Sequence, residues 1–138
     1  MGQGRFKKAK TKRKIQAYGM SSDEKLEKKE RLIKTSDFRK VYNKGSSFMS
    51  ESFVLKILPN TLNLNRIGFS ISSRSVKKAF RRNRIRRLFR EVFRKNKKEL
   101  KKGLDIVLVV RKDPGTNFSY KETEDIFLRL SKKARALA

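Results

Sequence analysis

The sequence contains no cysteine, no histidine and no tryptophan, and only two of its 138 residues are proline. Without cysteine there are no disulfides and no thiol nucleophile, and without histidine there is no imidazole general base and no zinc-finger ligand set. The thirteen acidic residues form no cluster along the sequence like that of a two-metal nuclease, although distant residues can meet in a fold. We therefore predict no catalytic residue and no metal ligand in the polypeptide.

Long apolar runs are also missing. No stretch approaches the roughly 20 apolar residues that span a bilayer, and the basic N-terminus lacks the apolar segment of a secretory signal. We therefore expect a cytoplasmic protein with no membrane partner.

Acidic charge is scarce relative to basic charge. Lys and Arg number 39 against 13 Asp and Glu, which gives a formal net charge of +26 and a pI near 11.0. A field of this sign concentrates polyanions around the chain, so nucleic acid is the expected partner. A chain of 138 residues accommodates one hydrophobic core and no second one.

The N-terminal region differs in composition from the rest. Residues 1–20 hold seven Lys or Arg, no acidic residue and few large apolar residues, so they cannot bury enough surface to offset the entropy of ordering. Residues 21–31 can form a short helix capped by Ser22, but their single Leu gives it little to pack. We expect a basic, disordered extension over residues 1–28 and one domain over residues 29–138.

Three segments have strand patterns. Segments 52–58 and 66–72 are separated by a connection containing Pro and Asn, so we expect them to pair as antiparallel neighbours. In the second, apolar residues alternate with polar or small ones, which predicts one buried face and one open face. Segment 105–110 (DIVLVV) is the most apolar and suits a central strand.

Two helices flank these strands. Segment 37–44 has apolar residues at helical spacing, with Thr35 or Ser36 as its N-cap and Gly45 as its stop. The string Ser119-Tyr120-Lys121-Glu122 matches a capping box that opens a last helix. With the basic helix described next, the order is α-β-β(-β)-α-β-α, with room for a short strand before the second segment. This order predicts an α+β fold, a two-layer α-β sandwich.

Residues 77–102 carry fourteen Lys or Arg against two Glu, yet they also contain an apolar stripe. The stripe has the i, i+3, i+4, i+7 pattern by which a helix docks on a core, and it consists of Ile85, Leu88, Phe89 and Val92. A polar face lies opposite within about 100° of arc, and it consists of Asn83, Arg86, Arg87, Arg90 and Arg94. The pattern predicts a folded helix that holds its charge at fixed geometry.

This polar face suits nucleic acid. Guanidinium groups bridge phosphate oxygens and stack on bases, and Asn offers both a donor and an acceptor. The alternative is a face that is only solvated. Like charges at i, i+3 and i, i+4 repel unless a polyanion is present, and only Glu91 and Glu99 offset them, so we favour recognition.

The aromatic residues of segment 37–44 have two interpretations. Phe38 and Tyr42 lie at i, i+4, a spacing usually found in a core. Beside an open sheet face they can instead form a stacking platform for single-stranded nucleic acid. Ser72, Ser73 and Arg74 are turn residues in one interpretation and part of this surface in the other.

The string 82–91, RNRIRRLFRE, resembles the RNR signature of the bacterial ribonuclease P protein subunit, whose pattern is R-N-R-x-K/R-R-x-x-R-E. The resemblance covers about residues 29–137. The flanking matches, in the expected order, are Arg31-Leu32, Asp37-Phe38, Gly68-Phe69-Ser70 and Asp105.

The resemblance implies an α-β sandwich with a left-handed βαβ crossover, against the usual right-handed rule, with the basic helix as the crossover element. It also implies an endoribonuclease subunit that joins a catalytic RNA, one protein per RNA. The complex removes the 5′ leader of precursor tRNA and so forms the mature tRNA 5′ end. Mg²⁺ would be bound chiefly by the RNA, which would carry the chemistry.

Site residues follow from the same resemblance. Contact with the catalytic RNA is assigned to Arg82, Asn83, Arg84, Arg86, Arg87 and Arg90, and the polar face adds Arg94. The leader would be held by Phe38, Tyr42 and the open sheet face, for which we select Phe53, Ser72 and Arg74.

This chain departs from the family pattern at two places. Ser73 and Arg74 stand where the family usually has two lysines, and Lys56 stands where some members have an aromatic residue. Both departures lie in the part of the chain that the resemblance gives to the leader, so they bear on leader preference. The alternative function is that of a ribosomal or nucleoid structural protein, which composition alone would favour.

Overall fold

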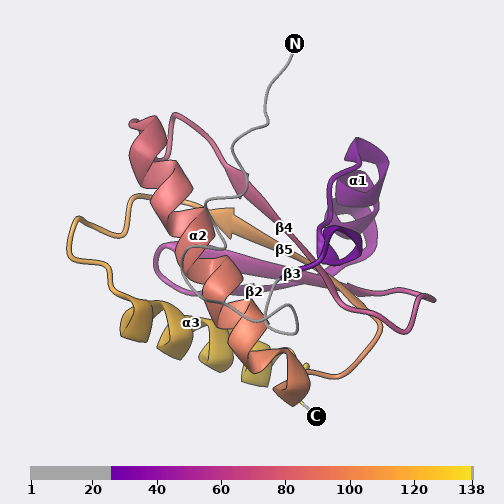
Figure 1. Cartoon of the computed structure of the whole chain (residues 1–138). Helices are drawn as coiled ribbons and strands as arrows, with labels where there is room; N and C mark the ends of the chain where they lie inside the picture. The colour runs from indigo at the N-terminus through magenta and orange to yellow at the C-terminus, as the bar shows by residue number, and fades with distance from the viewer. Residues whose placement is uncertain (1–25, 138) are drawn as a thin grey trace.

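The computed structural model describes residues 26–137; the expected basic extension lies mostly outside the described residues, as does Ser22. The helices and strands, in chain order, are the 3-10 turn η3 (Lys28–Glu30), α1 (Thr35–Lys44), β2 (Ser46–Met49), β3 (Phe53–Pro59), β4 (Arg66–Ile71), α2 (Ala79–Asn96), the 3-10 turn η4 (Lys97–Glu99), β5 (Leu104–Val110) and α3 (Tyr120–Lys133) (Figure 1).

The sheet has the strand order β2-β3-β5-β4. β3 pairs with β5 in antiparallel orientation and β4 pairs with β5 in parallel. The prediction that segments 52–58 and 66–72 are neighbours is therefore wrong, because β5 lies between them. β5 is apolar on both faces and takes the central position, where both faces are covered. The additional strand, β2, comes before the first predicted segment rather than before the second.

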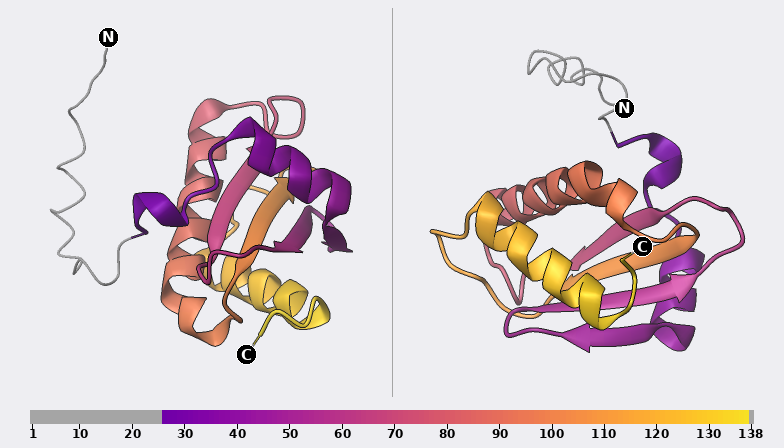
Figure 2. Two further views of the ribbon diagram at one scale, coloured as in Figure 1. Left: turned by 90° about the vertical axis from the view of Figure 1, so that its right-hand side faces the viewer. Right: turned by 90° about the horizontal axis from the view of Figure 1, so that it is seen from below.

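Helices cover the two faces of the sheet unequally (Figure 2). On one face α2 and α3 pack on the main core, into which β3 directs Phe53, Leu55 and Ile57. On the other face α1 packs on a cluster of only three buried apolar residues, Leu32, Val41 and Val107, so the large core that the sequence predicts stays single. The predicted α+β class is confirmed, with α2, α3 and the sheet as the principal two layers. The β4-α2-β5 unit is a βαβ crossover between parallel strands; its left hand stays a prediction.

α1 begins earlier than predicted. Its N-cap is Lys34, which makes no side-chain capping bond, so Thr35 and Ser36 lie inside the first turn and the predicted cap is wrong. The predicted stop at Gly45 is confirmed. A Cβ there would lie 2.5 Å from the Val41 carbonyl oxygen and 2.9 Å from that of Ile57, so close backbone approach requires glycine.

The capping box of α3 is confirmed. The Ser119 hydroxyl accepts from the Glu122 N–H at 3.2 Å, and the Glu122 carboxylate accepts from the Ser119 N–H at 3.3 Å. α2 buries its stripe in an aromatic core, where the Phe53 and Phe89 ring centroids lie 5.1 Å apart. These contacts fix which side of α2 faces outward.

Candidate nucleic-acid interface

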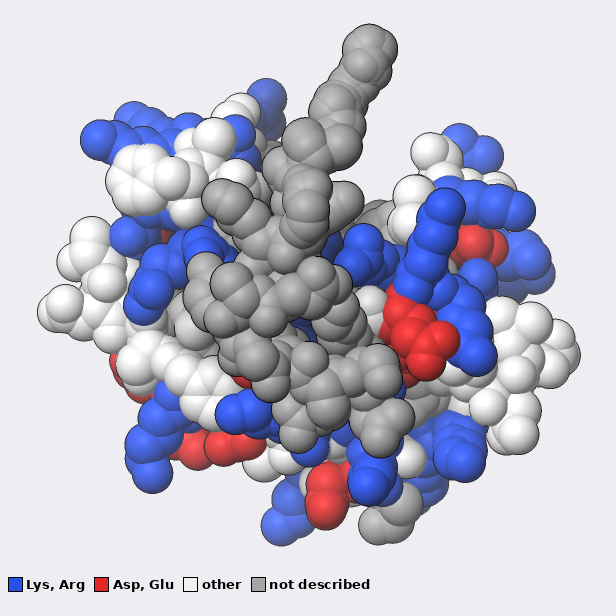
Figure 3. All heavy atoms as spheres, viewed as in Figure 1, with Lys and Arg blue, Asp and Glu red and all other residues white. Residues whose placement is uncertain are grey.

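The outward side of α2 carries a dense set of basic residues. Ile85, Phe89 and Val92 are buried, so the positions between them face away from the core. Lys and Arg also predominate on the face of the molecule drawn in Figure 3. We call the outward, at least partly exposed set on the helix the α2 basic surface, and it comprises Asn83, Arg84, Arg86, Arg87 and Arg90.

Two motif arginines also hold α2 in place. The Arg82 guanidinium donates to the carbonyl oxygens of Val76 at 2.8 Å and Lys77 at 2.9 Å, which fastens the loop that precedes the helix. Arg84 donates to the Phe118 carbonyl at 3.1 Å. Arg82 is half-buried in this role and lies at the margin of the α2 basic surface.

Arg94 does not share the exposed face. The residue is only 7% exposed, and its guanidinium group forms an ion pair with the Glu91 carboxylate. The N-terminal segment reaches this end of α2, since Lys97 donates to Glu30 at 3.0 Å. The helical spacing placed Arg94 outward, whereas packing at the C-terminal end of α2 buries it.

Arg90 lies at the side of α2 nearest β4. Its guanidinium carbon is 5.6 Å from the centroid of the Phe69 ring, a cation-π distance. Partial withdrawal from water, together with the positive charges of Arg31 and Arg86, lowers the pKa of Arg90 below its ordinary value. Arg86 in turn donates to the Asn83 side-chain oxygen at 2.9 Å.

The opposite side of the sheet presents a different surface beside α1. Val41 is fully buried and Phe38 is half-buried, whereas Tyr42 is 40% exposed. The Lys56 ammonium lies 5.2 Å from the centroid of the Tyr42 ring and donates to the Ser47 hydroxyl at 3.0 Å. Phe38 therefore contributes to the core with part of its ring, as the core interpretation predicts. Tyr42 is exposed enough for a ligand to reach its ring.

The sheet extends this surface beyond α1. Met49, Val54, Val109 and Ser70 are opposed across the four strands and share one face. Met49 is 52% exposed, and Ser70 is partly exposed. We call the accessible set the α1-side surface, and it comprises Phe38, Tyr42, Ser47, Met49, Lys56 and Ser70. The exposure of Met49 and Ser47 depends on the register of β2, which the sequence pattern did not reveal.

Phe53 does not belong to this surface. Its ring has no exposed area and lies on the other face of the sheet, against Phe89 and Phe118. A leader cannot reach it in this fold, because Phe53 and Val54 point to opposite faces of β3. We therefore leave Phe53 out of the leader site.

Ser72 and Arg74 lie in the exposed turn that follows β4. The Ser72 hydroxyl accepts from the Ser75 N–H at 3.1 Å, so this turn is closed by its own side chain. β4 is one of the two edge strands, and the turn continues from its end toward α2. The two residues thus stand between the α1-side surface and the start of α2.

A charged network holds α1 against the sheet. Asp105, which is buried, accepts from Arg66 Nε at 2.8 Å and Nη2 at 2.7 Å, and Arg66 also lies 3.4 Å from the Asp37 carboxylate on α1. The hydrogen bond to Asp105 is the main cause that raises the pKa of Arg66. These residues therefore position the aromatic side chains of α1.

The described residues offer no protein ligand set for a metal. Over residues 26–137, no three Asp or Glu side chains come together in a way that could hold an ion. Nor does any helix within that range combine the length and the apolar character needed to cross a membrane.

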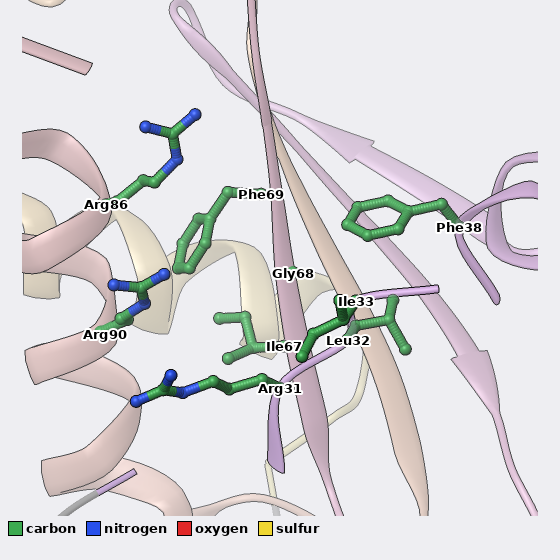
Figure 4. A pocket seen from close by; sticks show the side chains of 9 residues that line it. All are labelled: Arg31, Leu32, Ile33, Phe38, Ile67, Gly68, Phe69, Arg86 and Arg90. Atoms are coloured by element: carbon green, nitrogen blue, oxygen red, sulfur yellow. The ribbon is translucent and has the colours of Figure 1, made fainter. Parts of the chain in front are cut away.

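A groove of about 320 Å³ crosses the edge of the sheet at β4 (Figure 4). It is lined by residues of the segment before α1, of β4 and of α2: Arg31, Leu32, Ile33, Phe38, Ile67, Gly68, Phe69, Arg86 and Arg90. The groove thus contacts both surfaces defined above, through Phe38 on one side and Arg86 and Arg90 on the other.

Comparisons with known proteins agree with one another. A model of the family described as Ribonuclease P matches residues 26–135. The chain is 43% identical over 103 residues to the ribonuclease P protein component of Alkaliphilus oremlandii, which covers 75% of this chain and 89% of that protein. The fold is similar to that of the RNase P protein from Staphylococcus aureus, with a TM-score of 0.70 and 27% identity over 79% of this chain and 98% of that one. For the RNase P protein from Thermotoga maritima the TM-score is 0.67, with 34% identity over 75% and 96% of the two chains.

Proposed function

Because the chain belongs to the ribonuclease P protein family, we propose that it binds two RNAs through opposite sides of one sheet. The α2 basic surface takes the catalytic RNA, and the α1-side surface takes the single-stranded 5′ leader of precursor tRNA. As a ribonuclease P subunit the protein works in tRNA 5′ processing with an RNA partner. The family assignment decides against the ribosomal or nucleoid alternative.

The observation that carries the proposal is the exposed basic face of a helix whose other side is buried. The α2 basic surface holds four arginines at fixed spacing, which suits the phosphates of a folded RNA. Arg82 and Arg84 support it by fastening the helix to neighbouring carbonyls. Arg94 supports the same helix through its buried ion pair with Glu91.

The α1-side surface suits an unpaired strand. Tyr42 offers an exposed ring for base stacking, and Lys56 beside it offers a positive charge to a phosphate. Phe38 forms the inner part of this surface, and Ser72 and Arg74 extend it toward α2. With Lys56 where some family members have an aromatic residue, phosphate contact takes a larger share of leader binding here.

We assign the chemistry to the RNA, with Mg²⁺ bound chiefly by it. The acidic side chains that the structure describes include several already engaged in ion pairs, such as Asp105 with Arg66, Glu30 with Lys97 and Asp113 with Arg81. No step is therefore given to a metal held by the protein. The arginines neutralise phosphates that would otherwise repel one another as the RNAs assemble.

The proposed complex has one protein per RNA and acts in the cytoplasm. We propose one RNA-binding domain over residues 29–138 that follows a basic extension. The last residues of that extension already join the fold, since Leu26 packs on the main core and Lys28 begins η3.

Reconstitution tests this function. The full chain is added to its cognate catalytic RNA at low Mg²⁺, and cleavage of precursor tRNA is measured. We expect the protein to restore cleavage that the RNA alone performs only at higher Mg²⁺. Absence of stimulation by protein that binds the RNA would contradict the proposal.

A further inference from the structure

The chain segments that leave α2 and α3 meet at the end of α2 opposite to the turn that follows β4. Leu100 forms an isolated antiparallel bridge with Leu137, and the Lys101 N–H donates to the Ala136 carbonyl at 2.7 Å. The chain beyond α3 therefore returns to the chain beyond α2 (Figure 2). Five exposed basic residues lie on these two stretches, and we call them the C-terminal basic patch: Lys98, Lys101, Lys102, Lys132 and Arg135.

Arg135 has an unfavourable backbone conformation. Its φ is 57°, in the left-handed region, and it directly follows the C-cap of α3. The Arg135 N–H donates to the Lys132 carbonyl at 3.0 Å and the Ala136 N–H donates to the Ser131 carbonyl at 2.8 Å, which are the two hydrogen bonds of a Schellman motif. Glycine usually takes this position, because a Cβ makes the left-handed conformation costly. Folding alone would favour glycine at position 135, so the arginine needs another explanation.

The C-terminal basic patch has little acidic compensation. Within residues 26–137, none of the ion pairs of the structure includes a member of the patch. Positive charge near a helix C-terminus interacts favourably with the helix dipole, which accounts for Lys98 and Lys132. The other three members lie beyond the last helical residues, so the dipole does not account for them. A polyanion would relieve the repulsion among all five.

The composition of the patch favours the backbone of double-stranded RNA. Four of its five members are lysines, which contact phosphates as flexible point charges. The large apolar side chains that are exposed in the described part of the chain all lie outside the two stretches that form the patch, so it offers no stacking platform. Single-stranded RNA is recognised largely by stacking of its unpaired bases, whereas a double helix presents phosphates and 2′-hydroxyls.

We infer, resting on the proposed function, that the C-terminal basic patch binds the sugar-phosphate backbone of a double-stranded segment of the catalytic RNA. Leu100 and Ala136 beside the patch belong to the main core, so the patch lies on the same side of the sheet as α2. Its partner is therefore the RNA that the α2 basic surface binds, rather than the leader on the opposite side. Two separate contacts along one RNA fix the orientation of the protein on it.

The first test measures binding of the full chain to its cognate catalytic RNA over a range of salt concentrations. Arg135→Gly and Lys102→Gln should each weaken binding about fivefold at about 0.15 M salt, and each should reduce the slope of log affinity against log salt by about 0.9. The control Lys121→Gln removes one exposed charge from the first turn of α3 and should retain the wild-type slope.

Thermal unfolding separates RNA binding from a structural role of the arginine. Arg135→Gly should raise the midpoint of unfolding by about 4 °C, because glycine adopts the left-handed conformation without strain. The same variant should thus be more stable and bind RNA more weakly. A lower midpoint together with unchanged RNA affinity would show that Arg135 is structural.

The second test locates the RNA beside the patch in the assembled holoenzyme. Glu99→Cys carries a tethered iron chelate, since residue 99 is exposed, lies beside Lys98 and is not a member of the patch. The chain has no other cysteine. Hydroxyl radicals should cut the catalytic RNA in two stretches that pair with each other.

Three results would overturn the inference: wild-type salt slopes for both patch variants, cleavage from residue 99 that is absent or confined to unpaired nucleotides, or cleavage of precursor tRNA in place of the catalytic RNA. The proposed function fails in a different way, namely through wild-type protein that does not bind the catalytic RNA or binds it without stimulating cleavage. The wild-type measurements therefore distinguish the two failures.

Discussion

At the scale of single residues, the arginines of α2 divide their work. Arg82 and Arg84 donate to backbone carbonyls outside the helix, Arg86 and Arg90 line the groove, and Arg87 is exposed. One motif therefore both fixes the helix and supplies its binding groups. Substitutions of the arginines that fix the helix should lower protein stability, whereas substitutions of the exposed ones should lower RNA affinity. Both quantities therefore have to be measured for each variant.

Tyr42 is the sharpest probe of leader stacking. Tyr42→Ala should reduce the difference in binding free energy between precursor and mature tRNA by about 1 to 3 kcal/mol, because a stacked base loses its platform. The cost in folding should be small, since the ring is well exposed. Holoenzyme affinities for both tRNAs measure the effect.

The matched control is Phe80→Ala, which removes an aromatic residue that is 66% exposed at the start of α2. It should leave the difference between the two tRNAs unchanged. Phe38→Ala is a less direct probe, because its ring packs above Gly68 and its loss also destabilises the fold. A Tyr42→Ala holoenzyme with full discrimination would show that no base stacks there.

Gly68 fixes the distance between α1 and the sheet. A Cβ at this position would lie 2.6 Å from Phe38 Cζ and 3.0 Å from the Leu32 carbonyl oxygen. Gly68→Ala should therefore lower the free energy of unfolding by about 1 to 3 kcal/mol, measured in urea. Ser70→Ala, on the same strand and face, should change it by much less; equal effects would mean that the packing at Gly68 is not tight.

Two residue assignments could not have been made from the sequence pattern. A helical spacing gives the angle of Arg94 but not the packing at the end of α2, where its guanidinium meets Glu91. For Phe53, the strand was predicted but the face was not, because β3 is apolar on both faces. The exposed charges near the middle of α2 were predictable, since the buried stripe determines their direction.

At the scale of elements, the strand order illustrates the limit of local patterns. Two strands joined by a short connection usually pair, yet β3 and β4 are separated by β5. The most apolar segment was predicted as a central strand and takes that place as β5, but which strands lie beside it is decided by packing of the complete chain. The existence of these strands, the basic helix and the last helix was predictable from periodicity.

The capping box of α3 should contribute measurably to stability. Ser119→Ala removes the acceptor for the Glu122 N–H and should lower the free energy of unfolding by about 1 kcal/mol. Ser36→Ala is the control, because that residue lies inside α1 and does not cap it. Similar losses for both variants in urea unfolding would argue against a capping role for Ser119.

The α2 basic surface should govern the salt dependence of catalytic-RNA binding. Arg87→Ala combined with Arg90→Ala should weaken binding and reduce the slope of log affinity against log salt by about one unit per lost phosphate contact. The charge-matched control joins Lys121→Ala and Arg129→Ala, both exposed on α3. An unchanged slope in the first variant would mean that this face is only solvated.

At the scale of the whole molecule, the sheet separates two RNA-binding surfaces and the groove connects them around one edge. The net charge of +26 attracts RNA from every side, so affinity alone does not distinguish the surfaces. The test has to show which RNA lies near each surface, and this requires a probe attached at one known position. The absence of cysteine makes this possible, because one introduced thiol carries a probe at one site only.

The most direct measurement places a tethered iron chelate on each surface of the assembled holoenzyme. Ser47→Cys carries it on the α1-side surface and Phe80→Cys carries it at the start of α2; both positions are exposed. Hydroxyl radicals from the first probe should cut the precursor tRNA leader, and those from the second should cut the catalytic RNA. Cleavage of the same RNA segment from both positions would contradict the account of two surfaces on opposite sides of the sheet.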